Sequence, residues 1–514
     1  MSDPWDAFGG DEDDSSVDDQ NQGASSCETA PTESLALCLT KYFVRERHVS
    51  QFDKIRIRVS AKYDSSEWQS PLTRRGFTIV ANGDSTTTVD VLVGHGEDDQ
   101  AAISEMALAA IVPGGLLAVL SDEDQNNKPW NEAEYDNENV IVEAGWKIFT
   151  KWPAPIQSDT CPWLPAHYDF NAERSRVAEA CVPLTAIERE ECSQNFGSTL
   201  PDIKIQMAVQ NLQRYGYCVV PGLLTPETSR RFGEIALDDL HHAARVLKER
   251  EGVDLMEPRN SKQEPASYRE LSMREDMRMD LRHGPKLRAW RGLVGSRPWT
   301  ITALESKERL ATQATNPDRF LRGHPVLLEI VRRTTNPVNP ALSPGNWGRY
   351  NFGGRGPDGS FMDVRAGPVG AIISLPGSAD QALHADTPHL MENYDCLPAH
   401  YINIFTPGSA AHPAVGQTAL VHGSHRLSFT ASVDDNKMSW IQNMARPSLD
   451  LGDVLLFDCR ILHFGLANTS PKIERPLLYT NMTQHWFHDP KNWDDRRPIF
   501  TENDEASVIN ENLG

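Results

Sequence analysis

A chain of 514 residues is too long for one ordinary hydrophobic core, so two folded domains with tails are expected. Its 39% hydrophobic and 24% charged residues are typical of globular protein, and its formal net charge of -22 argues against non-specific binding to nucleic acid or anionic membrane. No segment approaches the roughly 18 to 20 apolar residues of a membrane span, and the first residues do not resemble a signal peptide, so we expect an intracellular, cytoplasmic protein, with the nucleus as the alternative compartment.

The first segment, residues 1–33, contains acidic side chains and no lysine or arginine. Such a segment repels itself and cannot bury a core, which predicts a disordered acidic tail. A solubilising role is the simplest interpretation. The alternative is a docking peptide around Trp5 to Phe8, through which the tail would bind a protein partner.

Residues 34–158 alternate short apolar strands with helical stretches, which predicts a small α/β layer structure. The expected helices cover 34–43 and 101–111, and the expected strands cover 53–60, 76–80, 89–93, 116–120 and part of 140–149.

This part of the chain resembles the C-terminal portion of class I S-adenosylmethionine-dependent methyltransferases, because a helix, the turn Pro113-Gly114-Gly115 and a strand follow one another. Those enzymes hold their cofactor on a glycine-rich turn after the first strand. Residues 34–65 contain no glycine, so that turn cannot form. The expected fold is therefore a degenerate Rossmann-like domain that serves packing or partner binding.

Residues 159–202 read as a linker with one helix near 184–194, and a second domain is expected over 203–500, followed by a C-terminal tail at 501–514. Its opening segment, 212–224, is predicted to contain a helix end, a strand and a turn. A long helix follows, with Thr225 as its cap, and Gly252 suits its end.

The segment 256–291 is rich in both signs of charge. Such a run is usually the solvated face of a helix. The functional alternative is a substrate-entry lid whose arginines grip an anionic substrate, since the guanidinium group pairs well with carboxylate or phosphate.

After about residue 345 the pattern changes to short strands separated by turns with glycine and proline, which favours a β-sandwich or barrel. The expected strands are 369–375, 401–405, 418–421, 454–457 and 477–483.

His384 and Asp386 stand two positions apart after the first of these strands, and in an extended segment residues i and i+2 project to the same side. His463 follows the strand at 454–457, and Arg475 opens the next strand. Two imidazoles and one carboxylate can occupy one face of an octahedral Fe(II) and leave three positions for a bidentate 2-oxo acid and O2. Zinc hydrolases need only one open position, so iron is the better assignment.

The segment His384-Ala385-Asp386 and residues 416–426, with His463 and Arg475, resemble the phytanoyl-CoA dioxygenase family of Fe(II)/2-oxoglutarate oxygenases over about residues 203–487. The resemblance implies a double-stranded β-helix (a jelly-roll or cupin-like domain) with flanking helices. It also implies iron held by His384, Asp386 and His463. Arg475 would hold the distal carboxylate of 2-oxoglutarate, because its planar fork pairs both oxygens.

The chain departs from the family near the metal. Family members often carry serine two residues after the distal histidine, where it helps to bind the co-substrate, and this chain has Gly465. Asn403 and Tyr401, on a strand expected to line the cavity, are the candidates for compensating contacts with the cofactor.

The sequence thus predicts a dioxygenase that uses Fe(II), 2-oxoglutarate and O2 to hydroxylate a small or conjugated substrate. The alternative is a non-catalytic scaffold or binding protein in which both domains are degenerate. The acidic tail and the N-terminal domain are the candidate binding sites for a protein partner.

Overall fold

In the computed structural model, the described residues are 31–45, 55–59, 66–80, 88–95, 111–120, 135–143, 146–152, 161–194, 199–258, 267–282, 284–286, 299–300, 321–335, 364–367, 369–391, 398–429, 437–484, 487 and 496–501. The predicted acidic tail lies outside them, apart from residues 31–33, where the first helix has already begun. The predicted C-terminal tail lies outside them beyond residue 501. Among the described helices, none combines the length and apolarity needed to cross a bilayer.

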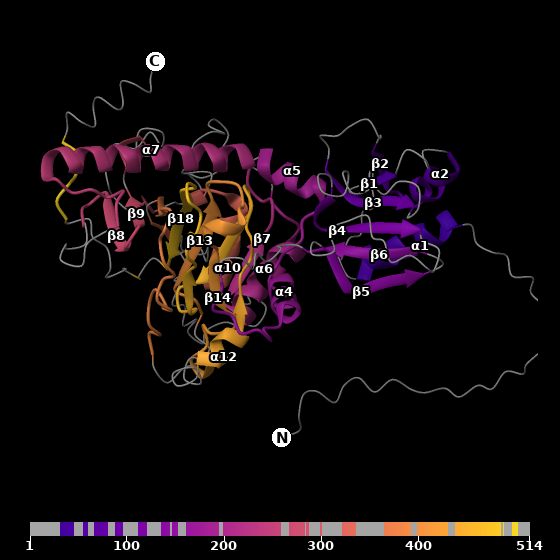
Figure 1. Cartoon of the computed structure of the whole chain (residues 1–514). Helices are drawn as coiled ribbons and strands as arrows, with labels where there is room; N and C mark the ends of the chain where they lie inside the picture. The colour runs from indigo at the N-terminus through magenta and orange to yellow at the C-terminus, as the bar shows by residue number, and fades with distance from the viewer. Residues whose placement is uncertain are drawn as a thin grey trace, which may run out of the picture.

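The N-terminal domain is a mixed six-stranded sheet at one end of the molecule (Figure 1), in the order β2-β1-β3-β4-β6-β5. The pairs among β2, β1, β3 and β4 are parallel, while β6 runs antiparallel to both of its neighbours. The elements are α1 (Pro31–Arg45), β1 (Arg56–Val59), α2 (Ser66–Arg74), β2 (Thr78–Val80), β3 (Val89–His95), β4 (Ile111–Leu120), β5 (Tyr135–Glu143) and β6 (Trp146–Lys151).

The expected sheet with parallel strands is therefore confirmed. Of the predictions within this domain, one helix cannot be checked and one turn is wrong. The helix predicted at 101–111 lies outside the described residues except for its last residue, which starts β4. The turn predicted at Pro113-Gly114-Gly115 is wrong, because these residues lie within β4, where the pairing with β3 jumps from Val89↔Ile111 to Val91↔Leu116. A strand irregularity absorbs the residues that the sequence pattern assigns to a turn.

Two helices connect the domains. α5 (Ala186–Gln194) agrees with the helix predicted near 184–194, whereas α4 (Phe170–Glu179) was not anticipated. Asp169 caps α4 by accepting a hydrogen bond from the amide of Ala172.

The C-terminal domain contains two antiparallel sheets. The larger follows the order β7-β16-β13-β18-β12-β9-β8, with β10 and β11 attached beside β18, and the smaller has the order β15-β14-β17. The strands are β7 (Tyr217–Val220), β8 (Leu271–Glu275), β9 (Arg278–Arg282), β10 (Trp299–Thr300), β11 (Arg365–Ala366), β12 (Gly370–Ser374), β13 (Tyr401–Pro407), β14 (Thr418–Val421), β15 (Met444–Ala445), β16 (Val454–Asp458), β17 (His463–Gly465) and β18 (Arg475–Thr483). The antiparallel C-terminal sheet expected from the sequence is confirmed.

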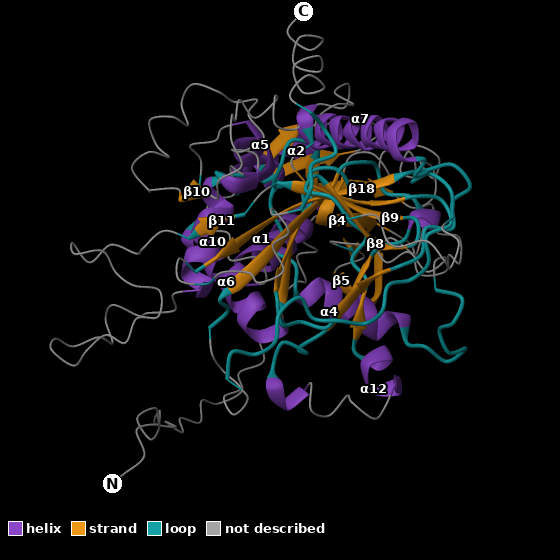
Figure 2. Ribbon diagram, turned by 90° about the vertical axis from the view of Figure 1, so that its left-hand side faces the viewer, coloured by secondary structure: helices purple, strands orange, loops and turns teal. Residues whose placement is uncertain are grey.

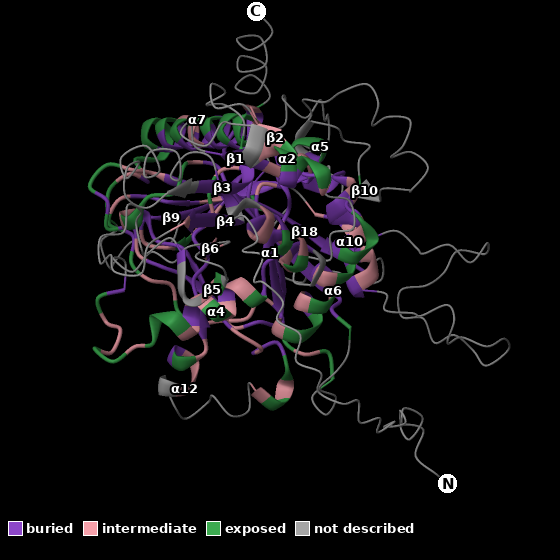
Figure 3. Ribbon diagram, turned by 90° about the vertical axis from the view of Figure 1, so that its right-hand side faces the viewer, coloured by how far each residue is buried: buried purple, intermediate pink, exposed green. Residues whose placement is uncertain are grey.

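Helices cover the outer face of the larger sheet, as Figure 2 shows for the long helix α7. The helices of this domain are α6 (Asp202–Tyr215), α7 (Pro226–Glu251), α10 (Pro325–Thr335) and α12 (Lys437–Gln442), with the 3-10 turn η6 (Pro413–Val415). α7 buries an apolar stripe that includes Phe232, Ala236 and Leu240, and its other face is exposed (Figure 3). Gly252, in the left-handed conformation, ends α7 as predicted.

The helical interpretation of the charged segment 256–291 is wrong, because its described part forms β8 and β9 as a hairpin. The pattern Arg278-Met279-Asp280-Leu281-Arg282 alternates with the period of a strand. All five residues are buried, with the apolar pair in the core beneath the helices and the charged side chains on the opposite face of the sheet. The arginines therefore line the interior of the domain and do not form a solvated surface.

Candidate metal centre

Three side chains that could hold a metal ion converge between the two sheets. His384 and Asp386 lie on the loop after β12, and His463 begins β17. His384 and His463 form an isolated antiparallel bridge in which each amide donates to the carbonyl of the other, at 3.1 and 2.8 Å. The amide of Asp386 donates to the carbonyl of Cys459 at 2.9 Å. Backbone pairing thus fixes the positions of all three residues.

The possible ligand atoms of the triad all lie within 4.8 Å of one another. The Nε2 atom of His384 is 4.0 Å from Oδ1 of Asp386, and that of His463 is 3.7 Å from Oδ2. His463 is buried, while His384 and Asp386 are partly exposed toward the cavity. The group therefore has one protected side and one open side, as an ion with exchangeable positions requires.

Hydrogen bonds orient all three side chains. The Nδ1 of His384 bonds the carbonyl of Ala382 at 2.7 Å, and that of His463 bonds the carbonyl of Ile461 at 3.0 Å. Because a carbonyl only accepts, each Nδ1 carries the proton and each Nε2 presents a lone pair toward the shared centre. The Nδ2 of Asn403 donates to Oδ2 of Asp386 at 2.7 Å, which holds the carboxylate in place.

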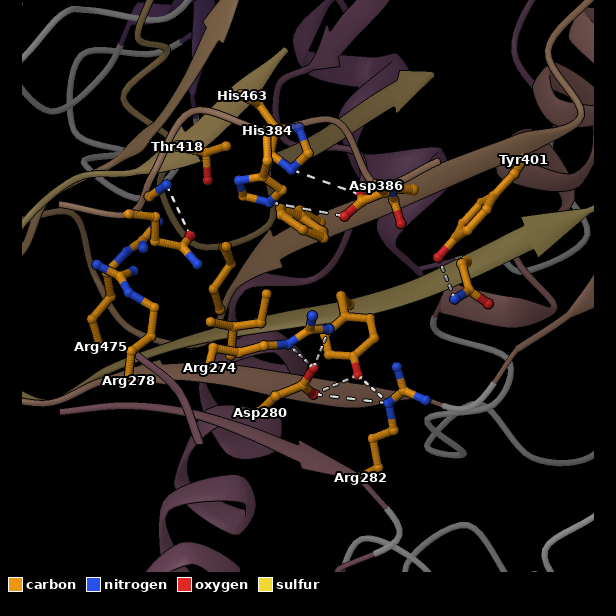
Figure 4. Close-up of a pocket in the computed structure, with 18 residues that line it drawn as sticks. Arg274, Arg278, Asp280, Arg282, His384, Asp386, Tyr401, Thr418, His463 and Arg475 are labelled. Atoms are coloured by element: carbon orange, nitrogen blue, oxygen red, sulfur yellow. Dashed lines mark hydrogen bonds and ion pairs between the residues drawn. The ribbon is translucent and has the colours of Figure 1, made fainter. Parts of the chain in front are cut away.

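The triad opens into a cavity of about 70 Å³ whose floor is the inner face of the larger sheet (Figure 4). On that floor Ser374 of β12 pairs with Arg278 on one side and with Arg475 on the other. The two arginines therefore stand in one row across three strands. Residues lining the cavity are Arg274, Arg278, Asp280, Arg282, Ile372, Gln381, His384, Asp386, Tyr401, Asn403, Phe405, Thr418, His463, Gly465, Arg475, Leu477, Tyr479 and Asn481.

Arg475 is a buried cation that needs an anion. It is 8% exposed, and it makes no hydrogen bond or ion pair within the part of the chain that the structure describes. Burial, together with the nearby positive charge of Arg278, lowers the pKa of Arg475 to about 9. A carboxylate bound in the cavity would compensate this charge and pair with the guanidinium fork.

Arg278 lies beside Arg475 and is a residue that the sequence did not single out for this site. Its Nη1 donates to the hydroxyl of Ser374 at 2.8 Å, and its Nη2 donates to the carbonyls of Ala379 and Leu466. These partners are neutral, and the nearest carboxylate oxygen, on Glu275, is 3.7 Å from Nε. The row thus brings two positive charges to one end of the cavity.

Gly465 makes room for Arg278. A Cβ atom built at Gly465 would lie 2.5 Å from Nη1 of Arg278 and 2.7 Å from Oε1 of Gln381. A serine at this position would therefore collide with two side chains that are themselves hydrogen bonded. The strand alternation in 278–282 was the signal that could have placed Arg278 in the cavity.

Tyr401 and Asn403 both line the cavity, as expected for β13. Asn403 contacts the carboxylate of Asp386, and the hydroxyl of Tyr401 accepts a hydrogen bond from Nδ2 of Asn481 at 2.7 Å. Direct contact of either residue with a co-substrate stays a prediction.

A second group of charged side chains occupies another part of the floor. Both Nε and Nη2 of Arg274 donate to Oδ2 of Asp280, at 2.9 and 2.7 Å. The hydroxyl of Tyr479 donates to Oδ1 of Asp280 at 2.7 Å and accepts from Nε of Arg282 at 2.8 Å. In Figure 4, Arg274 starts beside Arg278 and reaches toward Asp280, while Arg282 lies beyond Asp280 as seen from Arg475.

Residues 369–476 match the sequence profile of the family described as phytanoyl-CoA dioxygenase (PhyH). The matched segment contains the whole triad and Arg475. Members of this family use Fe(II) and 2-oxoglutarate. The donor set agrees with this chemistry, because two imidazoles and a carboxylate suit Fe(II), and Arg475, which has no ion pair among the described residues, suits a carboxylate. No curated protein matches the chain.

Among solved structures, similar chains include AviO1 from Streptomyces viridochromogenes Tue57, with 15% identity over 57% of this chain and 98% of that one and a TM-score of 0.31. The carbocyclase SnoK from nogalamycin biosynthesis, described as non-heme and alpha-ketoglutarate dependent, has 13% identity, coverage of 57% and 87%, and a TM-score of 0.30. EctD from S. alaskensis with bound Fe has 15% identity, coverage of 57% and 79%, and a TM-score of 0.29. Similarities this low carry no reaction or substrate over to this chain.

Proposed function

We propose that this protein hydroxylates a small or conjugated substrate. Its residues 369–476 form a phytanoyl-CoA dioxygenase family domain, and the protein is therefore an Fe(II)- and 2-oxoglutarate-dependent dioxygenase. The observation that carries the proposal is the triad, with its ligand atoms within 4.8 Å of one another and both histidines presenting Nε2. His384, Asp386 and His463 would hold the iron, within a domain that we interpret as a double-stranded β-helix.

Arg475 would bind the distal carboxylate of 2-oxoglutarate, and Arg278 would add positive charge behind it. This arrangement accounts for Gly465, because the guanidinium of Arg278 fills the space of the family's serine. When bound, the iron and 2-oxoglutarate together supply the activation of O2. The chain's contribution is to bind both, to orient the carboxylate of Asp386 through Asn403, and to keep the distal end of the co-substrate buried.

Hydroxylation is the favoured outcome, because Asp386 stands where halogenases of this group leave a position for chloride. The carboxylate is held by Asn403 within reach of both histidines, which supports its role as a ligand.

The test is the visible charge-transfer band that Fe(II) and 2-oxoglutarate should produce with the full-length protein under anaerobic conditions. We expect the band with the wild-type protein and its loss in His384→Ala. His167→Ala changes an exposed histidine away from the cavity and serves as the matched control. A folded wild-type protein that gives no band would favour the alternative, a non-catalytic scaffold.

For the N-terminal domain we propose a packing role without S-adenosylmethionine chemistry. Support comes from the missing glycine turn and from Asp90 of β3, whose carboxylate is committed to amides of Arg56 and Ala186. Calorimetry with S-adenosylmethionine should detect no heat of binding. Measurable binding would instead indicate a fusion of methyltransferase and oxygenase.

A further inference from the structure

Another cavity lies behind the metal centre, on the opposite face of the smaller sheet. In β17, His463 faces the metal centre and the next residue, Phe464, points to the other side. Phe464 pairs with Ala419 of β14, whose neighbour Thr418 lines the first cavity. The cavity on the outer face has a volume of about 220 Å³ and is lined by Trp163, Asp380, Gln381, Leu383, Trp440 and Phe464. We call it the aromatic cavity.

We propose that the aromatic cavity binds the quaternary ammonium group of a small molecule. This inference goes beyond the proposed function, because neither the iron nor 2-oxoglutarate requires a site on this face of the sheet.

Three aromatic rings from distant parts of the chain meet at the cavity. Trp163 precedes α4, Trp440 belongs to α12, and Phe464 belongs to β17. The ring centroids are 5.9 Å apart for the two tryptophans, and Phe464 is 6.2 Å from Trp163 and 5.7 Å from Trp440. One cation in the cavity can therefore lie within about 6 Å of all three centroids, which is the range of a cation-π contact.

The space beside these rings distinguishes the cluster from ordinary core packing. Protein interiors leave few voids larger than a water molecule, and one water needs only ~10 to 15 Å³. The aromatic cavity, at about 220 Å³, has room for a small organic group.

Asp380 adds a fixed negative charge to the aromatic cavity. Its Oδ2 accepts a hydrogen bond from Nε1 of Trp163 at 2.9 Å, and its Oδ1 accepts one from the amide of Ala467 at 2.7 Å. Within the described ranges Asp380 makes no ion pair, and the charge of Arg278 acts on it from beyond ion-pair distance. Electron-rich ring faces and a carboxylate together attract a cation.

The few acceptors in the cavity favour a quaternary ammonium over a primary one. A primary ammonium has three N–H donors, and each needs an acceptor when the group leaves water. Both oxygens of Asp380 already accept a hydrogen bond. Gln381 is also committed, since its Oε1 accepts from the amide of Gly465 and its Nε2 donates to Glu275. A quaternary ammonium has no N–H group, and its methyl groups gain from contact with the rings and Leu383.

A small molecule fits the site better than a methylated lysine within a peptide. In the described lining only Asp380 is charged, so no second charged side chain is present to bind the residues on either side of such a lysine.

The experiment measures binding of choline to the full-length protein by ligand-detected NMR. Two matched probes separate the contributions to binding. The first is the carbon analogue of choline, in which a quaternary carbon replaces the nitrogen, and the second is ethanolamine, which carries a primary ammonium. Choline should bind about tenfold more tightly than its carbon analogue, which is the scale of one desolvated cation-π contact, and more tightly than ethanolamine.

Trp440→Leu removes one ring and keeps an apolar side chain, so it should lower that ratio by about three- to fivefold, while Trp440→Phe should keep part of the ratio. Asp380→Asn should also lower it, because the negative charge is lost. Trp152→Leu, at a half-buried tryptophan of the N-terminal domain, and Asp238→Asn, on exposed α7, are the matched controls and should leave the ratio unchanged.

Circular dichroism and thermal unfolding check that each variant is folded. If Trp440→Leu does not fold, the ratios in Trp440→Phe and Asp380→Asn decide.

Equal binding of choline and its carbon analogue, tighter binding of ethanolamine, or no binding of choline would overturn the inference. A preference for choline that persists in both Trp440→Leu and Asp380→Asn would also overturn it, because the ligand would then lie elsewhere. Binding of a peptide with trimethylated lysine, without binding of choline, would overturn it in favour of a protein partner.

Discussion

At the scale of single residues, the most informative position is Gly465, where the chain lacks the hydroxyl expected from its family. The structure relates this loss to Arg278, whose guanidinium takes the space of a side chain at 465 and adds charge beside Arg475. We therefore expect Gly465→Ser to weaken 2-oxoglutarate binding by about tenfold, because the new side chain displaces a charged hydrogen-bonding group. Calorimetry with the metal-loaded protein measures this.

A double-mutant cycle separates this explanation from a general loss of packing. Arg278→Met alone should weaken binding of 2-oxoglutarate, but in that background Gly465→Ser should cost much less, because the collision with Nη1 is gone. Tighter binding in Gly465→Ser would mean that the family's serine simply improves the site. Additive effects would mean that the two positions act independently.

Asn403 gives a second prediction at this scale. Its side chain donates a hydrogen bond to Oδ2 of Asp386, which orients a proposed metal ligand. Asn403→Ala should lower the affinity for Mn(II), used as a spectroscopic substitute for Fe(II), by about 10- to 100-fold. Electron paramagnetic resonance of free Mn(II) measures it, and Asn443→Ala, which removes a bond to a helix carbonyl, is the control. Unchanged affinity would exclude this positioning role.

At the scale of elements, the β8-β9 hairpin was the main error of the sequence interpretation. Its charges indicated a solvated helix, although Arg278 to Arg282 alternate with period two. Charge normally marks the outer face of a strand, and here the inner face is the charged one because it lines a polar cavity. The strands 369–375, 401–405, 418–421, 454–457 and 477–483 were predictable because apolar runs and glycine or proline turns bound them.

The turn of this hairpin stores backbone strain at Met277, which has a φ of 60° and is 7% exposed. At ordinary strand positions glycine is less stable than alanine by about 0.5 to 1 kcal/mol. At Met277 the order should invert, because alanine keeps the left-handed strain of about 1 kcal/mol and glycine releases it. Both variants should be less stable than wild type, since the buried side chain contributes about 1.5 to 3 kcal/mol.

Urea unfolding of Met277→Ala and Met277→Gly measures this order. An alanine variant as stable as the glycine variant would show that the turn relaxes without cost. Loss of 2-oxoglutarate binding in the alanine variant alone would show that the turn also sets the position of Arg278.

At the scale of the whole molecule, the sequence predicts two domains and the residues of a candidate metal centre, but it does not predict how the domains join. The sequence predicts that one site contains His384, Asp386, His463 and Arg475, because a local motif marks each of these residues. The join depends on side chains whose partners are distant in sequence. Asp90 of β3 accepts the amide of Ala186, which begins α5, and Arg56 pairs with Glu190 at 2.6 Å. No pattern in the sequence marks such pairs.

This join should respond to pH through Asp90. Burial raises the pKa of Asp90 to about 6, against 3.8 unperturbed, so between these values the folded protein binds a proton that the unfolded chain has lost. The contribution of Asp90 to stability is therefore greatest at low pH and is lost as the pH rises through about 6, by about 1 kcal/mol between pH 5 and pH 7. Burial raises the pKa of Asp453 to a similar value, and buried histidines such as His324 act in the opposite sense, so the total slope is not diagnostic.

The difference between wild type and Asp90→Asn isolates the effect, because asparagine cannot titrate. Relative to wild type, the variant should be more stable at pH 7 than at pH 5 by about 1 kcal/mol, since it lacks the desolvated charge. Denaturant unfolding at the two pH values measures this, with Asp238→Asn on exposed α7 as the control. If the stability difference between wild type and Asp90→Asn does not change with pH, Asp90 is ionised at both pH 5 and pH 7. The amides of Arg56 and Ala186 and the charge of Arg189 would then outweigh the cost of burial. The contact between the domains would then keep its charge at pH 5, and acid would not strengthen it.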